Sequence, residues 1–213
     1  MILLLFCLGT PSFAVAQVTD GQKNGPLKII VLGDSLSAGY KLPREAAFTS
    51  QLETALKAEG YDVAVPNTGV SGETTTGGLS RLDWLLADKP SLMIVELGAN
   101  DGLRGIDPAR TRENLDRILM RLKEAGIPAV LAGMMAPRNL GQEYGRVFDA
   151  IYPELAEKHD VPLYPFFLDG VAMDPKLNQE DGMHPTAEGV AVIVTRILPT
   201  ITQALDRIKA GTP

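Results

Sequence analysis

The stretch LKIIVLGDSLS, residues 27–37, joins a short apolar run to an abrupt polar turn. Its first six residues are mostly aliphatic and lack the alternation of a half-exposed strand, which predicts a strand buried in a parallel sheet. Gly33 permits a sharp exit from that strand. Ser35 then falls at the start of a helical turn, where its backbone N–H points outward and the helix dipole favours negative charge. The stretch therefore predicts a strand, a tight turn and a helix, with polar groups at the turn.

The same alternation of strands and helices continues along the rest of the chain. Further strands are expected at residues 61–65, 92–97, 129–135 and 161–164. Helices are expected at residues 46–58, 79–87, 110–125, 148–158 and 187–208. This order predicts an α/β fold, a doubly wound parallel sheet between two helical layers. Ligands of such folds bind beyond the carboxyl ends of the strands, so polar residues there are the candidates for chemistry.

The composition is that of one ordinary globular domain. The 213 residues are 45% hydrophobic and 22% charged, with a formal net charge of −6. No block of like charge is present, and nothing resembles the basic stripe with which nucleic-acid binders neutralise phosphates. We therefore expect no nucleic-acid partner.

The N-terminus has the pattern of a signal peptide, residues 1–16. Residues 2–8 are continuously apolar but too few to span a bilayer, and Ala14-Val15-Ala16 offers a small-x-small cleavage site before Gln17. No Lys or Arg precedes the apolar run, so a buried N-terminal segment or a retained anchor stays an alternative. We expect a flexible leader at 17–26, a domain at 27–208, and a periplasmic or secreted protein without a stable membrane anchor.

Cysteine and metal chemistry have little support in this sequence. Cys7 is the only cysteine, and cleavage of the signal peptide would remove it, which excludes a cysteine nucleophile and a cysteine-ligated zinc in the mature chain. There is no His-Glu-x-x-His motif, and the glycine patterns that cradle phosphates are absent as well. We expect neither a metal nor a cofactor.

Two of the expected turns carry candidate residues. Ser35, after the first strand, could be a nucleophile whose own amide stabilises an oxyanion. Alternatively, Asp34 or Ser35 is simply a helix N-cap. After the strand at 92–97, Asn100 could aim its amide N–H at an oxyanion, although Asn and Asp beside glycine are also ordinary turn formers.

A third candidate group precedes the last helix, in the segment DGMHP, residues 181–185. A serine nucleophile needs a base for its proton and a carboxylate that fixes the tautomer of that base. Asp181 and His184 could supply both, and Pro185 restricts His184 to extended conformations. The other histidine, His159, lies at the end of an expected helix and is interpreted as a solvated C-terminal residue.

A glycine-containing segment, residues 67–74, follows the expected second strand. Glycine allows close approach of the backbone to a ligand, so the Gly72 N–H could be a second oxyanion donor. Alternatively, the segment is a loop before a helix, with residues 74–76 as caps.

Together and in order, these four segments resemble the blocks of the SGNH (GDSL) hydrolase superfamily. The resemblance extends over residues 27–205 and is greatest to the branch that holds periplasmic acyl-CoA thioesterases, lysophospholipases and arylesterases. It implies a three-layer α/β/α, flavodoxin-like fold with a five-stranded parallel sheet.

The resemblance also assigns roles to residues. It implies Ser35 as nucleophile, His184 as base and Asp181 as the carboxylate that orients it. The oxyanion hole would consist of the Ser35 and Gly72 amides and the Asn100 side chain. The loop at 103–108 would move on substrate binding. Mapping also predicts a set of substrate-binding side chains: Leu103, Ile106, Met134, Met135, Pro137 and Leu140.

The implied activity is hydrolysis of carboxylic esters and thioesters through an acyl-enzyme. The substrates would be small molecules with acyl or aryl groups, of the arylesterase, acyl thioesterase or lysophospholipase type. One alternative is a carbohydrate acetyl esterase of the same fold, and another is a non-catalytic ligand-binding module. We expect a monomer or a weak oligomer.

Overall fold

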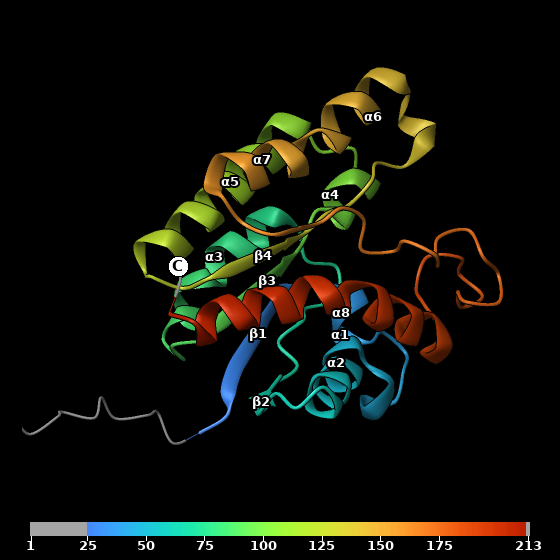
Figure 1. Ribbon diagram of the computed structural model, residues 1–213. Coiled ribbons are helices and arrows are strands. Elements are labelled where there is room, and N and C mark those ends of the chain that lie inside the picture. The colour runs from blue at the N-terminus through green and yellow to red at the C-terminus, as the bar shows by residue number, and fades with distance from the viewer. Residues whose placement is uncertain (1–24, 212–213) are drawn as a thin grey trace, which may run out of the picture.

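The computed structural model describes residues 25–211, so the expected signal peptide and residues 17–24 of the expected leader lie outside the described residues. Five parallel strands form one sheet in the order β2-β1-β3-β4-β5 (Figure 1). Their bounds are β1 Leu27–Gly33, β2 Val63–Ala64, β3 Leu92–Glu96, β4 Ala129–Ala132 and β5 Leu163–Tyr164. The central pair, β1 and β3, is aligned over five residue pairs that end at Gly33 and Glu96.

Eight α-helices lie among the described residues. They are α1 Ser35–Ala38, α2 Phe48–Ala58, α3 Thr75–Leu86, α4 Ala99–Leu103, α5 Pro108–Glu124, α6 Gln142–Asp149, α7 Ile151–His159 and α8 Ala187–Lys209. Helix α8 packs against α2 on one face of the sheet, while α5 packs against α3 and α7 on the other (Figure 1). The predicted α/β/α order of layers and the five parallel strands are confirmed.

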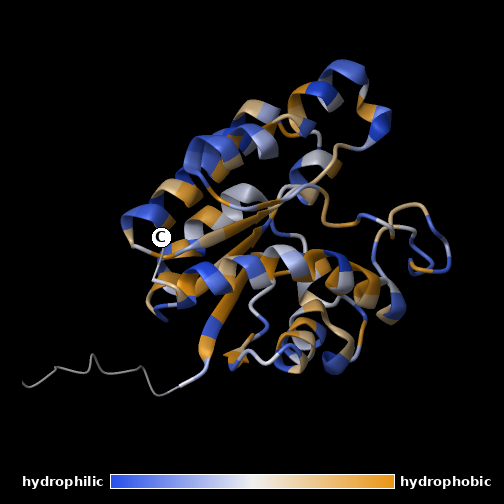
Figure 2. Cartoon of the chain, in the orientation of Figure 1, coloured by the Kyte–Doolittle hydropathy of each residue, from blue (hydrophilic) through white to orange (hydrophobic). Residues whose placement is uncertain are grey.

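The core lies on both faces of the central strands. Residues 29–32 and 92–95 are fully buried, which is why these runs are apolar without alternation. Each such side chain contributes about 1.5–3 kcal/mol of favourable burial free energy. Figure 2 shows the strands mainly in hydrophobic colours and the helices with mixed faces. This buried scaffold fixes the strand ends, so the loops that leave them hold defined positions.

Several elements differ from the predicted ones. Helix α3 begins at Thr75, four residues before the predicted start, and Thr74 is its N-cap. The first turn was not predicted because it contains Gly77 and Gly78, which are poor helix formers. Gly78 lies so close to Leu97 that a Cβ at this position would collide with the Leu97 side chain. The predicted strands at 61–65 and 129–135 are shorter than expected. The helix predicted at 148–158 corresponds to α7, whereas α6 just before it was not predicted.

Within the described part of the chain, α8 is the one helix long and apolar enough to cross a membrane by length and composition. Its apolar side chains, among them Val190, Ile193 and Ile197, are buried inside the protein. It contacts α2, β4 and β5. Helix α8 is therefore a core helix of this fold.

Candidate active site

The candidate residues meet at the carboxyl edge of the sheet, where a cavity of about 710 Å³ opens. Its floor comes from the turns after β1 and β3, and its walls from residues 134–138 and from the long loop between β5 and α8. Ser35, Gly72, Asn100 and His184 all line it. The position agrees with the rule that ligands of open α/β sheets bind beyond the carboxyl ends of the strands.

The turn after β1 assigns the N-cap to Asp34 and leaves the Ser35 hydroxyl free. One carboxylate oxygen of Asp34 accepts the Leu36 N–H at 2.9 Å, which caps α1. The Ser35 Oγ lies 2.9 Å from His184 Nε2 and the residue is 9% exposed. The capping interpretation is thus right for Asp34 and wrong for Ser35.

Asp181 holds His184 from the opposite side. Its Oδ2 lies 2.8 Å from His184 Nδ1, and its Oδ1 accepts the backbone N–H groups of Met183 and His184, each at 3.0 Å. These hydrogen bonds, with the one from the His184 amide largest, lower the pKa of Asp181 to about 2. The carboxylate therefore stays charged at neutral pH and favours the tautomer in which Nδ1 carries the proton. In that tautomer, Nε2 is free to accept the Ser35 proton.

Asn100, in the first turn of α4, is bonded to Asp34. Its Nδ2 donates one N–H to Asp34 Oδ2 at 2.9 Å. Because an amide nitrogen carries two N–H donors, this bond fixes the plane in which the second one lies. Asp34 therefore connects the turn that carries Ser35 with the predicted oxyanion donor, a role that the sequence alone did not reveal.

Gly72 lines the same cavity with a backbone φ of +79°, a conformation that favours glycine. Its carbonyl accepts a hydrogen bond from Arg104 Nη2 at 2.7 Å, which turns the carbonyl towards the guanidinium. Arg104 follows α4 directly, so the same short element positions both Asn100 and the Gly72 loop.

Four of the six predicted substrate-binding residues line the cavity: Leu103, Met134, Met135 and Pro137. Ile106 and Leu140 do not, which corrects that part of the prediction. The Ile106 carbonyl instead receives the Tyr144 hydroxyl at 2.7 Å, and Leu140 ends the 3₁₀ turn Arg138–Leu140 beside the cavity.

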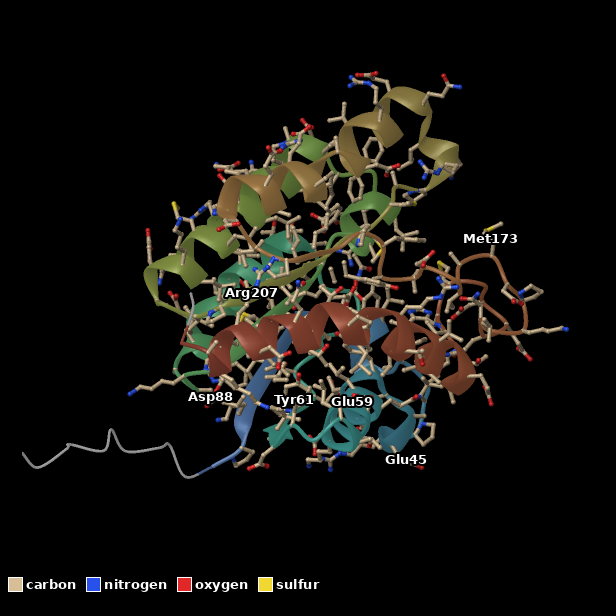
Figure 3. All side chains as sticks on the ribbon, in the orientation of Figure 1. Glu45, Glu59, Tyr61, Asp88, Met173 and Arg207 are labelled. Carbon is tan, nitrogen blue, oxygen red and sulfur yellow. The ribbon has the colours of Figure 1, made fainter. Side chains whose placement is uncertain are left out.

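Much of the remaining apolar lining was not predicted. It comes from Tyr40 and from the loop between β5 and α8: Phe166, Leu168, Ala172, Met173 and Met183. That loop has no helical or strand periodicity, so no sequence pattern indicated which of its side chains face inward. Met173, which is 93% exposed, projects at its outer end (Figure 3).

His159 is placed differently from the prediction. It is the last residue of α7, but its side chain is only 10% exposed and its Nε2 lies 2.6 Å from Asp116. It is therefore a hydrogen-bond partner of Asp116 within the far helical layer rather than a solvated residue. Between residues 25 and 211, no cluster of three or more His, Cys, Asp or Glu side chains is arranged to hold a metal ion.

A hydroxyl, an imidazole and a carboxylate in series, beside amide donors and an apolar cavity, form the arrangement that serine hydrolases use. The model of the GDSL-like Lipase/Acylhydrolase family matches residues 31–192 of this chain. An arylesterase of Vibrio mimicus is 43% identical over 188 residues, which cover 88% of each chain.

Two further proteins show the same relationship. The thioesterase 1/protease 1/lysophospholipase L1 of Escherichia coli (strain K12) is 42% identical over 161 residues, 75% of this chain and 76% of the relative. The crystal structure of AlinE4, an SGNH-hydrolase family esterase, superposes with a TM-score of 0.72 at 48% identity and covers 88% of this chain and 99% of its own. The chain therefore belongs to the GDSL-like lipase/acylhydrolase family of SGNH hydrolases, and the predicted resemblance is confirmed.

Proposed function

We propose that this protein is a serine hydrolase that cleaves carboxylic esters and thioesters through an acyl-enzyme. The observation that carries the proposal is the unbroken series from Ser35 Oγ to His184 at 2.9 Å and from His184 to Asp181 at 2.8 Å, at the floor of an apolar cavity. The names of the relatives, an arylesterase and a thioesterase/lysophospholipase, agree with this reaction class.

In the proposed reaction, Ser35 Oγ attacks the carbonyl carbon while His184 Nε2 takes its proton. The negative charge on the former carbonyl oxygen is stabilised by the Ser35 and Gly72 amides and by the free N–H of Asn100. The imidazolium then returns its proton to the leaving alcohol or thiol, and the acyl group stays on Ser35. A water molecule activated by His184 releases the acid and restores the hydroxyl.

Replacing Asn100 with alanine is expected to lower kcat by about 10² to 10³-fold with little change in KM, because an oxyanion donor acts mainly in the transition state. Steady-state kinetics on p-nitrophenyl butyrate measure both constants. Asn139→Ala, at an exposed asparagine of the 3₁₀ turn, is the matched control and should behave as the parent does. A raised KM with an unchanged kcat would show that Asn100 binds substrate rather than the oxyanion.

The rate should rise with pH for two reasons. His184 accepts a proton only when its ring is neutral. In addition, burial raises the pKa of Asp34 to about 6 against the opposing hydrogen bonds from Leu36 and Asn100. The carboxylate that fixes Asn100 is thus present above pH 6 and is lost as the pH falls through that value.

In a plot of log kcat against pH, the acid limb is expected to have a slope greater than one, the slope that a single ionising group would give. It is measured between pH 4.5 and 8 with an ester whose product absorbs at every pH. An acid limb with unit slope would show that ionisation of Asp34 does not affect kcat, and a flat profile would also exclude His184 as the base.

The substrate class follows from the apolar walls, which fit acyl or aryl groups better than sugars. We therefore expect turnover of p-nitrophenyl esters beyond acetate and of an acyl thioester. Rates on esters of two to sixteen carbons, with palmitoyl-CoA and a lysophospholipid beside them, measure this preference. Activity confined to acetyl groups, and above all to acetylated carbohydrates, would instead favour the carbohydrate acetyl esterase.

We also propose that residues 1–16 direct export, so that the enzyme works in the periplasm or outside the cell without a membrane anchor. The pattern that supports this is a short apolar run followed by a small-x-small site. Mass spectrometry of the exported protein should find Gln17 at its N-terminus, and an N-terminus that begins at Met1 would contradict the proposal.

A further inference from the structure

A second carboxyl group lies buried beneath the nucleophile turn. Glu96 is the last residue of β3, pairs with Gly33 across the sheet and is fully buried. Glu96 is the one residue of β3 with an ionisable side chain, and the other four are Leu, Met, Ile and Val. The proposed mechanism does not use it, and a carboxyl group at the centre of a parallel sheet needs a reason.

Glu96 contacts the turn that carries the nucleophile. Its Oε2 accepts the backbone N–H of Asp34 at 3.3 Å, whereas its Oε1 has no hydrogen-bond partner among the described residues. A Cβ on Gly33 would collide with both Glu96 Oε2 and the Ser37 hydroxyl. Glycine at position 33 therefore leaves the room in which the Glu96 carboxyl reaches the turn.

No cation of the described residues is bonded to Glu96. The titratable or charged side chains around it and Asp34 are Glu73, Arg81, Tyr152 and His184. Arg81 is engaged elsewhere, because it binds Glu73 at 2.6 Å and the Gly33 carbonyl at 3.2 Å. Tyr152 donates its hydroxyl to the Leu97 carbonyl at 2.9 Å.

These surroundings favour the neutral acid. A buried carboxylate without a counter-ion is costly enough that such a group protonates instead. Burial, and then the charge of Asp34, raise the pKa of Glu96 well above its ordinary range, although hydrogen bonds from Asp34 and Ser37 act in the opposite direction. Two ionised carboxylates side by side would also repel each other.

We propose that Glu96 is a positioning residue, a buried carboxylic acid that supports the Asp34 turn and, through Asp34, fixes Asn100 and Ser35 for the reaction. The connection runs from Glu96 to the Asp34 amide, and from the Asp34 carboxylate to Leu36 at the start of α1 and to Asn100 in α4. A neutral Glu96 satisfies the amide without opposing the charge on Asp34. The inference rests on the proposed hydrolase function.

Kinetics of two variants test the positioning. Glu96→Gln has nearly the shape of the neutral acid and keeps an oxygen for the Asp34 N–H, so its kcat should stay within about threefold of the parent. Glu96→Ala removes that oxygen and should lower kcat by about tenfold or more, with KM within about twofold. Equal losses in both variants, or none in the alanine variant, would overturn the proposal.

The pH dependence of stability tests the neutral form independently of catalysis. In the unfolded chain Glu96 ionises at an ordinary pH, while in the folded chain it keeps its proton, so the unfolded state binds fewer protons and the parent loses stability as the pH rises. Glutamine has no such proton. The Tm of Glu96→Gln relative to the parent should therefore increase from pH 5 to pH 8.

Glu53→Gln is the matched control. Glu53 also accepts a backbone N–H, that of Val65 at 2.7 Å, but it binds Lys57 as well and its pKa is lowered, chiefly by that hydrogen bond. Its carboxylate is stabilised above the unfolded pKa, so the relative Tm of Glu53→Gln should fall from acid to neutral pH. If Glu96→Gln follows this control, or shows no trend, Glu96 is not a neutral acid and the proposal fails.

The hydrolase proposal and the proposed role of Glu96 can be contradicted independently of each other. Melting curves need no activity, so a rising relative Tm would support the neutral Glu96 even if Ser35→Ala kept its activity and the hydrolase proposal failed. Conversely, loss of activity in Ser35→Ala with a flat melting trend would leave the hydrolase intact and remove the role of Glu96. If Glu96→Ala is not recovered folded, the glutamine variant alone decides, because it must keep kcat and also show the rising trend.

Discussion

Replacing Ser35 with alanine is expected to lower kcat on p-nitrophenyl butyrate by at least about 10⁴-fold, because the acyl-enzyme cannot form without the hydroxyl. The Ser35 Oγ is the oxygen that His184 contacts in the cavity. What remains would be the small rate that the oxyanion donors give to attack by water. Initial rates at saturating ester, with active protein quantified by its melting transition, measure the effect.

Ser80→Ala is the control for this experiment, since the Ser80 hydroxyl is exposed on α3 and donates to the Gly77 carbonyl within that helix. It should keep the parental rate. A Ser35→Ala variant with parental hydrolysis would exclude Ser35 as nucleophile and return the chain to the non-catalytic binding module.

The second large effect is expected for His184→Ala, with kcat lowered by about 10² to 10⁴-fold, the contribution of a positioned general base. Because the two residues act as one unit, the double variant with Ser35→Ala should be no slower than Ser35→Ala alone. The measurement is the same ester assay on the single and double variants.

His159→Ala is the matched control, as the chain has only two histidines. His159 pairs with Asp116 on the far helical layer, so its loss should lower Tm without changing kcat. A larger loss of activity in His159→Ala than in His184→Ala would contradict the assignment of the base.

The apolar runs made much of the fold predictable. The strands β1 and β3 are buried on both faces, so continuous aliphatic runs in the sequence mark them directly. Helix α5 was equally clear because it buries one regular stripe. Two-residue strands such as β2, and short helices such as α4, carry too few residues for any periodicity, and tertiary packing decides their extent.

The location of the site was predictable because several of its residues directly follow expected strands. Ser35, Asn100 and the Asp181–His184 pair each had an ordinary local interpretation, and only their joint order, with the resemblance it carries, favoured chemistry. The structure brings Ser35 and His184 together across 149 positions of sequence. The cap by Asp34 was among the local interpretations, but neither its bond to Asn100 nor the unpaired oxygen of Glu96 follows from local sequence. The single Glu inside LMIVE was a signal available for interpretation.

The lining of the cavity was the least predictable part. Ile106 and Leu140 are close in sequence to the lining residues Leu103 and Arg138 but do not line the cavity themselves. A shift of two or three positions along the chain is enough to direct a side chain away from the cavity. The loop between β5 and α8 supplies apolar groups without any regular pattern. Side-chain direction in irregular segments depends on long-range packing, which sequence periodicity does not encode.

Reaction with phenylmethylsulfonyl fluoride, followed by peptide mass mapping, shows whether Ser35 is an activated nucleophile, because sulfonylation requires a serine that an adjacent base has activated. We expect one label per chain, on the peptide that contains Ser35, and much slower labelling in His184→Ala than in His159→Ala. No label, or a label on another residue while Ser35 stays unmodified, would contradict it.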